Sequence, residues 1–170
     1  FIVMEYVDGK TMSQIYRQLR ARKKELPLDI FLYCFIELCH GLSYIHRKKG
    51  PSGQRLGVVH RDVSPQNIIL SYAGNIKIID FGVAKAEFLE EKTEAGVLKG
   101  KFAYMSPEQT KGDKLDYRSD LFSVGILMWE LLALDRLFKR GSNRETIKAI
   151  QKAKFNLPST VRKDVPKALD

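Results

Sequence analysis

The sequence predicts an α+β fold that is mostly helical and carries one small β-hairpin. Two long apolar segments, residues 28–48 and 121–134, predict helices. Between them, the short apolar runs Ile68–Leu70 and Ile76–Ile78 flank the turn Ala73-Gly74-Asn75 and predict two paired strands. The chain has 170 residues, which is long enough for one domain with its own hydrophobic core.

Three further segments are predicted outside these elements. Phe1–Glu5 is an apolar run that enters the turn Val7-Asp8-Gly9, and it predicts a buried strand. Residues 11–22 predict a helix that ends before Pro27. Residues 143–154 predict a second, weaker amphipathic helix.

The two long apolar segments differ in pattern. In residues 28–48 three-and-four spacing gives the helix one apolar face, formed by Leu32, Phe35, Ile36, Cys39, Leu42 and Ile45. Residues 121–134 are so apolar that they predict a helix buried all round, although it is too short to span a bilayer. Residues 49–57 are rich in glycine and polar residues, and residues 81–108 have no sustained period, so both are predicted to be loops.

The net charge is +9 at pH 7, and much of it lies in two basic clusters, residues 20–24 and 47–49. No aromatic residues alternate with these cations, as a nucleic-acid stacking surface would require. Both clusters fall where helices are expected to end, and cations there complement the helix dipole. We therefore expect no nucleic-acid partner, and the surplus charge suits an acidic or polyanionic partner better.

The chain is predicted to be neither secreted nor membrane-spanning. Charges interrupt each long apolar stretch within a few residues, so no segment is expected to contact or cross a membrane. The sequence opens on Phe1 without a start methionine, which predicts a fragment of a cytoplasmic protein whose other segments could anchor it to a membrane. Cys34 and Cys39 lack the C-x-x-C spacing of a metal site and are expected to be small buried side chains.

Three polar clusters interrupt apolar sequence. Residues 60–67 read His-Arg-Asp-Val-Ser-Pro-Gln-Asn and directly precede the first strand of the predicted hairpin. Asp80-Phe81-Gly82 closely follows the second strand, and Ser106-Pro107-Glu108 comes later. Charges this close to core residues are costly unless they are paired or bind a metal ion. Each cluster alone is a weak signal, because a tripeptide occurs by chance and a carboxylate at a strand end is more often a cap than a ligand.

Together the clusters resemble the eukaryotic-type protein kinase family. H-R-D with an asparagine five residues after the aspartate, then a hairpin, D-F-G and P-E, is the order of that family's signature. The resemblance is closest to bacterial serine/threonine kinases, judging by residues 104–109, Tyr-Met-Ser-Pro-Glu-Gln. It implies that residues 1–7 are the last strand of the N-terminal lobe and the hinge. Residues 8–170 would then be part of the C-terminal lobe, with the catalytic loop at 60–67 and the activation segment at 80–108.

The resemblance also implies catalytic roles. Asp62 would accept or orient the proton of the substrate hydroxyl, and Asn67 and Asp80 would supply the oxygen ligands that Mg²⁺ prefers, with Mn²⁺ as an alternative. The alternative for Asp62 and Asn67 is a purely structural role, in which they only cap a turn.

A second group of residues is similar to the ATP site of the family. Met4 would be the gatekeeper, and the backbones of Glu5 and Val7 would pair with adenine. Asp8 is similar to residues that lie near the ribose, and Ile69 resembles the residue that packs beneath adenine.

Structural roles carry over to residues around the catalytic loop. Asp120 resembles the acid at the start of the central helix that holds the backbone of His60 and Arg61. Glu108 resembles an acid that pairs with an arginine further along, and since that partner lies beyond this sequence, Glu108 could be left unpaired.

Regulation is implied by the arginine before the catalytic aspartate. Thr93 carries the only hydroxyl between Val83 and Lys99, and a phosphate on it could pair with Arg61 and order the loop that follows Phe81 and Gly82. That Thr93 is an ordinary exposed residue is nearly as well supported.

The sequence departs from the family at two positions. Serine/threonine kinases usually have lysine two residues after the catalytic aspartate, where this chain has Ser64, and threonine where it has Lys101. Those two side chains normally meet beside the catalytic aspartate. The hypothesis is that Lys101 replaces the missing charge; the alternative is that loss of the lysine marks a weakened or inactive kinase.

The implied function is serine/threonine protein kinase activity in bacterial signalling, with ATP and a protein substrate as partners. Serine or threonine is favoured over tyrosine because Ser64-Pro65-Gln66 keeps the proline of that pattern. The sequence has no Gly-rich phosphate loop, no V-A-I-K-type lysine and no helix glutamate to pair with it, so the chain alone is expected to be inactive. A pseudokinase or scaffold that only binds partners is the alternative, and a small-molecule kinase ranks last.

Overall fold

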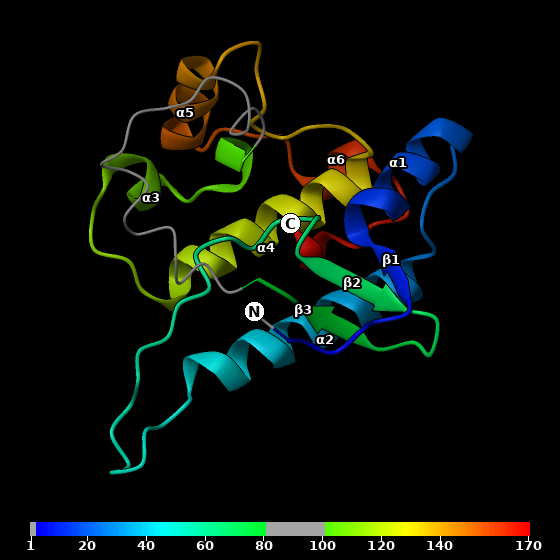
Figure 1. Ribbon diagram of the computed structural model, residues 1–170. Coiled ribbons are helices and arrows are strands. Elements are labelled where there is room, and N and C mark those ends of the chain that lie inside the picture. The colour runs from blue at the N-terminus through cyan, green and yellow to red at the C-terminus, as the bar shows by residue number, and fades with distance from the viewer. Residues whose placement is uncertain (1–2, 81–100) are drawn as a thin grey trace.

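The computed structural model describes residues 3–80 and 101–170, and the side chain of Lys101 is not described. It has a mixed α+β architecture with helices as the larger part. Two long helices, α2 (Leu28–His46) and α4 (Tyr117–Ala133), lie side by side at the centre, and a small sheet lies beside them (Figure 1). This arrangement agrees with the predicted fold class.

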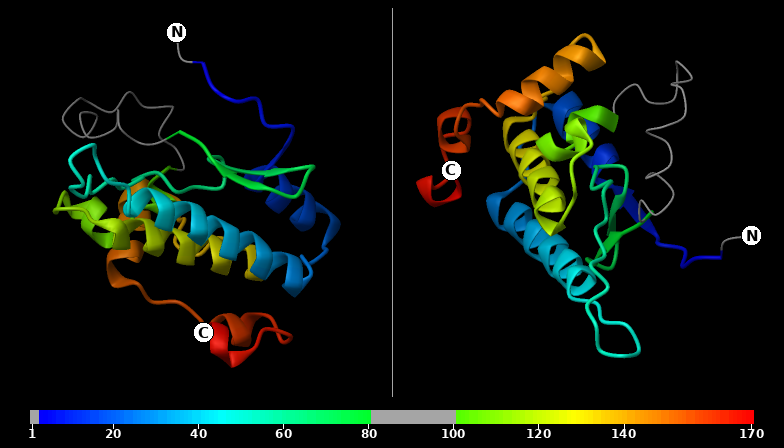
Figure 2. Two further views of the ribbon diagram at one scale, coloured as in Figure 1. Left: turned by 90° about the horizontal axis from the view of Figure 1, so that it is seen from below. Right: turned by 90° about the vertical axis from the view of Figure 1, so that its left-hand side faces the viewer.

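Shorter helices surround the central pair. They are α1 (Met12–Arg22), α3 (Pro107–Lys111), α5 (Asn143–Lys152) and α6 (Pro158–Val161), with 3₁₀ turns at Lys101–Tyr104 and Lys167–Leu169. The helices predicted over residues 11–22, 28–48 and 143–154 are confirmed to within two residues at each end. Figure 2 shows α1 beside the sheet and α6 beyond α4, on the far side from the sheet.

The sheet has three antiparallel strands in the order β1 (Gly9–Thr11), β2 (Ile68–Ser71) and β3 (Ile76–Ile78). The predicted hairpin of β2 and β3 is confirmed, and β1 was not predicted. A Cβ atom at Gly9 would lie 2.3 Å from the carbonyl oxygen of Leu70, so only glycine lets β1 approach β2 this closely. In the sequence the same glycine indicates a turn, which is why the strand was missed.

The buried strand predicted at Phe1–Glu5 is wrong for the residues that the structure describes. Val3 to Tyr6 form no strand, and the side chain of Val3 is 94% exposed. A strand is stable only when its backbone groups pair with a neighbour, and within the described part of the chain the sheet begins at β1.

α2 supplies one wall of the core. Its buried face consists of Phe31, Cys34, Phe35, Leu38 and Leu42. The predicted apolar face is wrong at Ile36, which is 52% exposed. Both cysteines are free, and Cys39 is half-buried. By length and composition α2 could cross a membrane, which contradicts the expectation that no segment could. Because this face packs with α4 in one hydrophobic cluster, α2 is a core helix of this domain.

α4 begins four residues earlier than predicted, because the side chain of Asp116 caps it by accepting a hydrogen bond from the amide of Arg118 at 2.9 Å. It is not buried all round: Leu121 is 44% exposed. Its buried residues include four polar ones, Ser119, Asp120, Ser123 and Glu130, which bind neighbouring segments.

Two predicted loops have different outcomes. Residues 47–57 form an arm that projects from the end of α2, closed by a bridge between Lys49 and Arg55 (Figure 1), and this loop prediction holds. The loop predicted over residues 81–108 is wrong at its end, where a 3₁₀ turn covers Lys101–Tyr104 and α3 begins at Pro107. A capping box between Ser106 and Gln109 starts α3.

Candidate active site

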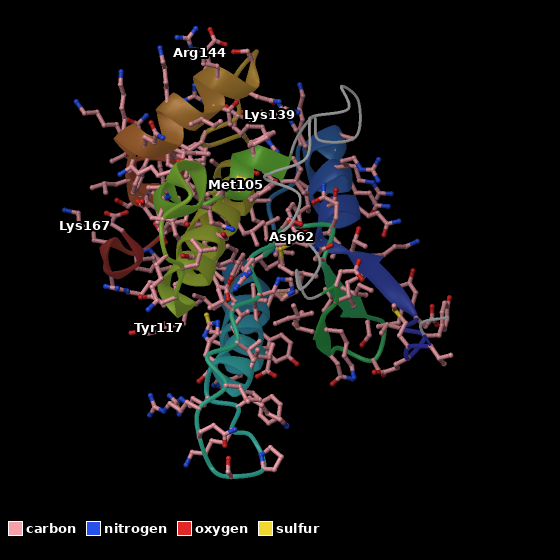
Figure 3. The ribbon with its side chains drawn as sticks, turned by 60° about the vertical axis from the view of Figure 1, so that its left-hand side comes forward. Asp62, Met105, Tyr117, Lys139, Arg144 and Lys167 are labelled. Atoms are coloured by element: carbon pink, nitrogen blue, oxygen red, sulfur yellow. The ribbon has the colours of Figure 1, made fainter. Side chains whose placement is uncertain are left out.

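Asp62 and Asn67 form the centre of the site. The side-chain amide nitrogen of Asn67 donates to the backbone oxygen and to Oδ2 of Asp62, both at 2.9 Å. The backbone turns within the same loop, since the amide of Asn67 donates to the carbonyl of Ser64 at 2.9 Å. Because the nitrogen of the Asn67 amide faces Asp62, its side-chain oxygen is the atom that can bind a cation. Figure 3 shows Asp62 between the helices α3 to α5 and the sheet.

Asp80 follows the neighbouring strand β3. The amide of Ile79 donates to the carbonyl of Asn67 at 2.9 Å, and a ring nitrogen of His60 lies 3.2 Å from the carbonyl of Ile79. These contacts tie the end of β3 to the catalytic loop, so Asn67 and Asp80 stand at adjacent strand ends, as predicted. Asp80 has a left-handed backbone (φ 56°) and an exposed side chain.

The carboxylate of Asp120 holds the backbone just before Asp62. Its two oxygens accept hydrogen bonds from the amides of His60 at 2.8 Å and Arg61 at 2.9 Å. This contact is the one that the sequence resemblance implied. A third contact was missed: Nε2 of His46, at the end of α2, lies 2.7 Å from Oδ2 of Asp120. His46 lies near the end of the predicted helix and is not part of a motif, so no local signal identifies it.

Arg61 has a left-handed backbone conformation, with φ at 66°. Such a conformation costs a non-glycine residue about 1–2 kcal/mol and persists only where neighbouring groups hold it. Its amide binds Asp120, and its carbonyl accepts a hydrogen bond from the side chain of Gln109 at 2.8 Å. Its own side chain is exposed.

The residues predicted for the ATP site fall in β2 and in the segment that precedes β1. Ile69 in β2 pairs with Thr11 and Lys77, and the carbonyl of Asp8 accepts from the amide of Tyr72 at 3.0 Å. Met4, Glu5 and Val7 precede β1, and a carboxylate oxygen of Glu5 lies 3.1 Å from Nζ of Lys77. The contact of Glu5 with Lys77 therefore links this amino-terminal segment to β3.

Glu108 is not left unpaired, so that expectation is wrong. The hydroxyl of Ser119 in α4 donates to its carboxylate at 2.5 Å. Partial burial would raise the pKa of Glu108, but hydrogen bonds from Ser119, its own backbone and Ser106 outweigh this effect and lower it. The hydrogen bond from Ser119 fixes α3 to the start of α4.

A buried polar network fixes the segment before α3. The hydroxyl of Tyr104 donates to Oε2 of Glu130 at 2.8 Å and accepts from Nη1 of Arg136 at 2.6 Å, and Tyr104 is 5% exposed. Burial, followed by the nearby charge of Glu130, raises the pKa of Tyr104 far above its ordinary value. The sequence pattern indicates Tyr104 only through the resemblance, and it gives no sign that Glu130 and Arg136 are its partners.

Several predicted site residues cannot be placed. Phe81, Gly82 and Thr93 lie outside the described residues, as does the side chain of Lys101. Ser64 is buried in the catalytic loop. The predicted roles of these residues remain predictions.

The chain is similar to known protein kinases along its whole length. Residues 1–169 match the family model described as "Protein kinase domain". The chain is 38% identical over 170 residues to the tyrosine-protein kinase MasK of Myxococcus xanthus. The matched region is 100% of this chain and 26% of that protein. It is 35% identical over 162 residues to the serine/threonine-protein kinase PknA of Corynebacterium glutamicum (95% of this chain, 32% of that protein).

A third relative, the serine/threonine-protein kinase A of Synechocystis, is 37% identical over 136 residues, which is 78% of this chain and 25% of that protein. The chain thus spans about a quarter to a third of the length of these three relatives.

Proposed function

Because the chain belongs to the protein kinase family, we propose that the protein containing it transfers the γ-phosphate of ATP to serine or threonine side chains of other proteins. The observation that carries the proposal is the hydrogen bond that the side-chain amide of Asn67 donates to the carboxylate of Asp62 at 2.9 Å, with Asp80 at the adjacent strand end. Phosphoryl transfer requires positioning and charge neutralisation more than covalent work by the protein. This arrangement suits both requirements.

Each residue has a definite part in the proposed reaction. Asp62 orients the substrate hydroxyl and accepts its proton, and Asn67 holds the Asp62 carboxylate in place. The side-chain oxygens of Asn67 and Asp80 are hard ligands of the kind that Mg²⁺ or Mn²⁺ accepts, so the residues present fit a divalent ion. Such an ion, when bound, supplies positive charge beside the phosphates.

The choice of serine or threonine over tyrosine rests on the proline of Ser64-Pro65-Gln66 and on the relatives named serine/threonine kinases. Tyrosine is the rival acceptor, because MasK is named a tyrosine-protein kinase. The test is to incubate the full-length protein with ATP, Mg²⁺ and a protein substrate and to identify the phosphorylated amino acid. Phosphotyrosine alone would reject the serine/threonine assignment, and absence of transfer with retained nucleotide binding would favour a binding module.

The 170-residue chain by itself is expected to show no ATP-dependent phosphorylation above background. The glycine-rich loop and the V-A-I-K-type lysine, which cradle the phosphates in this family, are not among its residues. The same phosphorylation assay on the purified chain and on the full-length protein checks this prediction. Robust transfer by the chain alone would contradict it.

We also propose that Lys101 supplies the positive charge that Ser64 does not. In the full-length protein, Lys101→Ala should lower kcat by about a hundredfold, and Ser64→Ala by no more than about threefold. Steady-state kinetics with ATP and a peptide substrate measures both values. Similar small effects from the two changes would disprove compensation, and little activity in the unmodified protein would favour the weakened-kinase alternative.

A further inference from the structure

The peptide unit between Arg61 and Asp62 is held at both ends. Its carbonyl oxygen, which belongs to Arg61, accepts a hydrogen bond from Nε2 of Gln109 at 2.8 Å. Its N–H, which belongs to Asp62, lies 3.3 Å from Nδ1 of His60. Because this peptide unit is directly attached to the Cα atom of Asp62, the two contacts set the direction from which the Asp62 side chain leaves the backbone.

Gln109 is itself held in one orientation. It is the third residue of α3. Its side-chain oxygen Oε1 accepts a hydrogen bond from the backbone amide of Ser106 at 2.8 Å, and its backbone amide donates to the hydroxyl of Ser106 at 3.3 Å. The carbonyl of Arg61 needs a donor, which only the side-chain nitrogen of Gln109 can be. The backbone amide of Ser106 needs an acceptor, which only the side-chain oxygen can be. The two partners therefore determine which end of the Gln109 amide faces which.

A glutamate in place of Gln109 could cap α3 but could not bond to the carbonyl of Arg61. Glutamate is as good as glutamine as the third residue of a capping box, and α5 has such a box between Ser142 and Glu145. An ionised carboxylate has no proton to donate to the Arg61 carbonyl. The helix cap alone would thus accept either residue, whereas the contact with Arg61 requires the amide.

The chain offers an internal comparison. α1 begins with the same kind of capping box, between Thr11 and Gln14. Among the contacts of the described residues, the side chain of Gln14 bonds only within its own cap, whereas the side chain of Gln109 also reaches a carbonyl 48 residues away in sequence.

We propose that Gln109 is a positioning residue that ties α3 to Arg61, whose backbone is left-handed, and thereby orients Asp62. The inference rests on the proposed kinase function and adds a residue to it. It makes the geometry of the catalytic aspartate depend on the docking of α3, because one side chain caps the helix and holds the loop.

The test compares Gln109→Glu and Gln109→Met with the matched control Gln14→Glu in the full-length protein. Both changes at position 109 should lower kcat about tenfold, because small displacements of a catalytic group are costly. The KM values for ATP and for the peptide substrate should stay within about twofold of the unmodified protein. Gln14→Glu should leave kcat unchanged. Hydrogen exchange of a proteolytic peptide containing His60–Asp62 should be faster in Gln109→Glu than in the control.

Two results would overturn the inference. One is a kcat within twofold of the unmodified protein for both changes at position 109. The other is a higher KM for the peptide with unchanged kcat, which would show that Gln109 serves α3 alone. If the unmodified full-length protein transfers no phosphate, the proposed function fails. The hydrogen-exchange comparison then still decides whether Gln109 holds the loop.

Discussion

Replacing Asp62 with asparagine in the full-length protein is expected to lower kcat by about a thousandfold, which is within the usual contribution of a positioned general base. Asparagine has the same shape as aspartate, and its side-chain oxygen can still accept the hydrogen bond that Asn67 donates at 2.9 Å. The carboxylate that would take the proton of the substrate hydroxyl is lost. Steady-state kinetics measures the loss, and thermal unfolding of the variant shows that the fold is kept.

The matched control for this change is Asp29→Asn. Asp29 is an exposed acid in the first turn of α2, so its removal deletes one negative charge and leaves the catalytic loop untouched. Its kcat should match that of the unmodified protein. If Asp62→Asn keeps more than about a tenth of the activity, Asp62 is not the proton acceptor.

Replacing Asp120 with alanine is expected to have the second-largest effect, on stability and activity together. Asp120 is 1% exposed, and its carboxylate accepts from the amides of His60 and Arg61 and contacts His46. Removing it takes the carboxylate acceptor away from these buried and partly buried donors, which costs about 1–3 kcal/mol for each unsatisfied group. We expect the free energy of unfolding to fall by about 4 kcal/mol and phosphorylation to be lost, since Arg61 is no longer held in its left-handed conformation.

Asp116→Ala is the control for Asp120→Ala, because Asp116 lies four residues earlier and caps the same helix from the surface. Loss of such a cap costs about 1 kcal/mol. Urea unfolding of both variants gives the comparison. Equal destabilisation by the two changes would mean that the contacts of Asp120 with the catalytic loop contribute little to stability.

Much of the fold could be predicted because its signals are local. The spacing of apolar residues in α2 and the turn at Gly74 between β2 and β3 depend on neighbours within a few positions, and both were found. β1 depends on a contact between Gly9 and Leu70, which are far apart in the sequence. No local pattern contains such a contact, so this strand was missed.

The same difference applies to the site. Asp62, Asn67 and Asp80 were predicted to be site residues because their order and spacing along the chain form a motif. The structure adds Gln109, which reaches the catalytic loop from α3, and His46, which contacts Asp120 from the end of α2. Neither stands in a motif that indicates this contact. Glu108 was expected to be left unpaired because its arginine partner in the family lies beyond this sequence, whereas the hydroxyl of Ser119 donates to its carboxylate.

The burial of Tyr104 limits which tyrosines of this domain a kinase could modify. Its hydroxyl lies between Glu130 and Arg136, so the oxygen that would receive a phosphate is inaccessible to another active site while the domain is folded. Tyr6 and Tyr72, which are 88% and 67% exposed, have no such protection. Phosphate found on Tyr104 would therefore have been added before folding or while this segment was locally unfolded from α4.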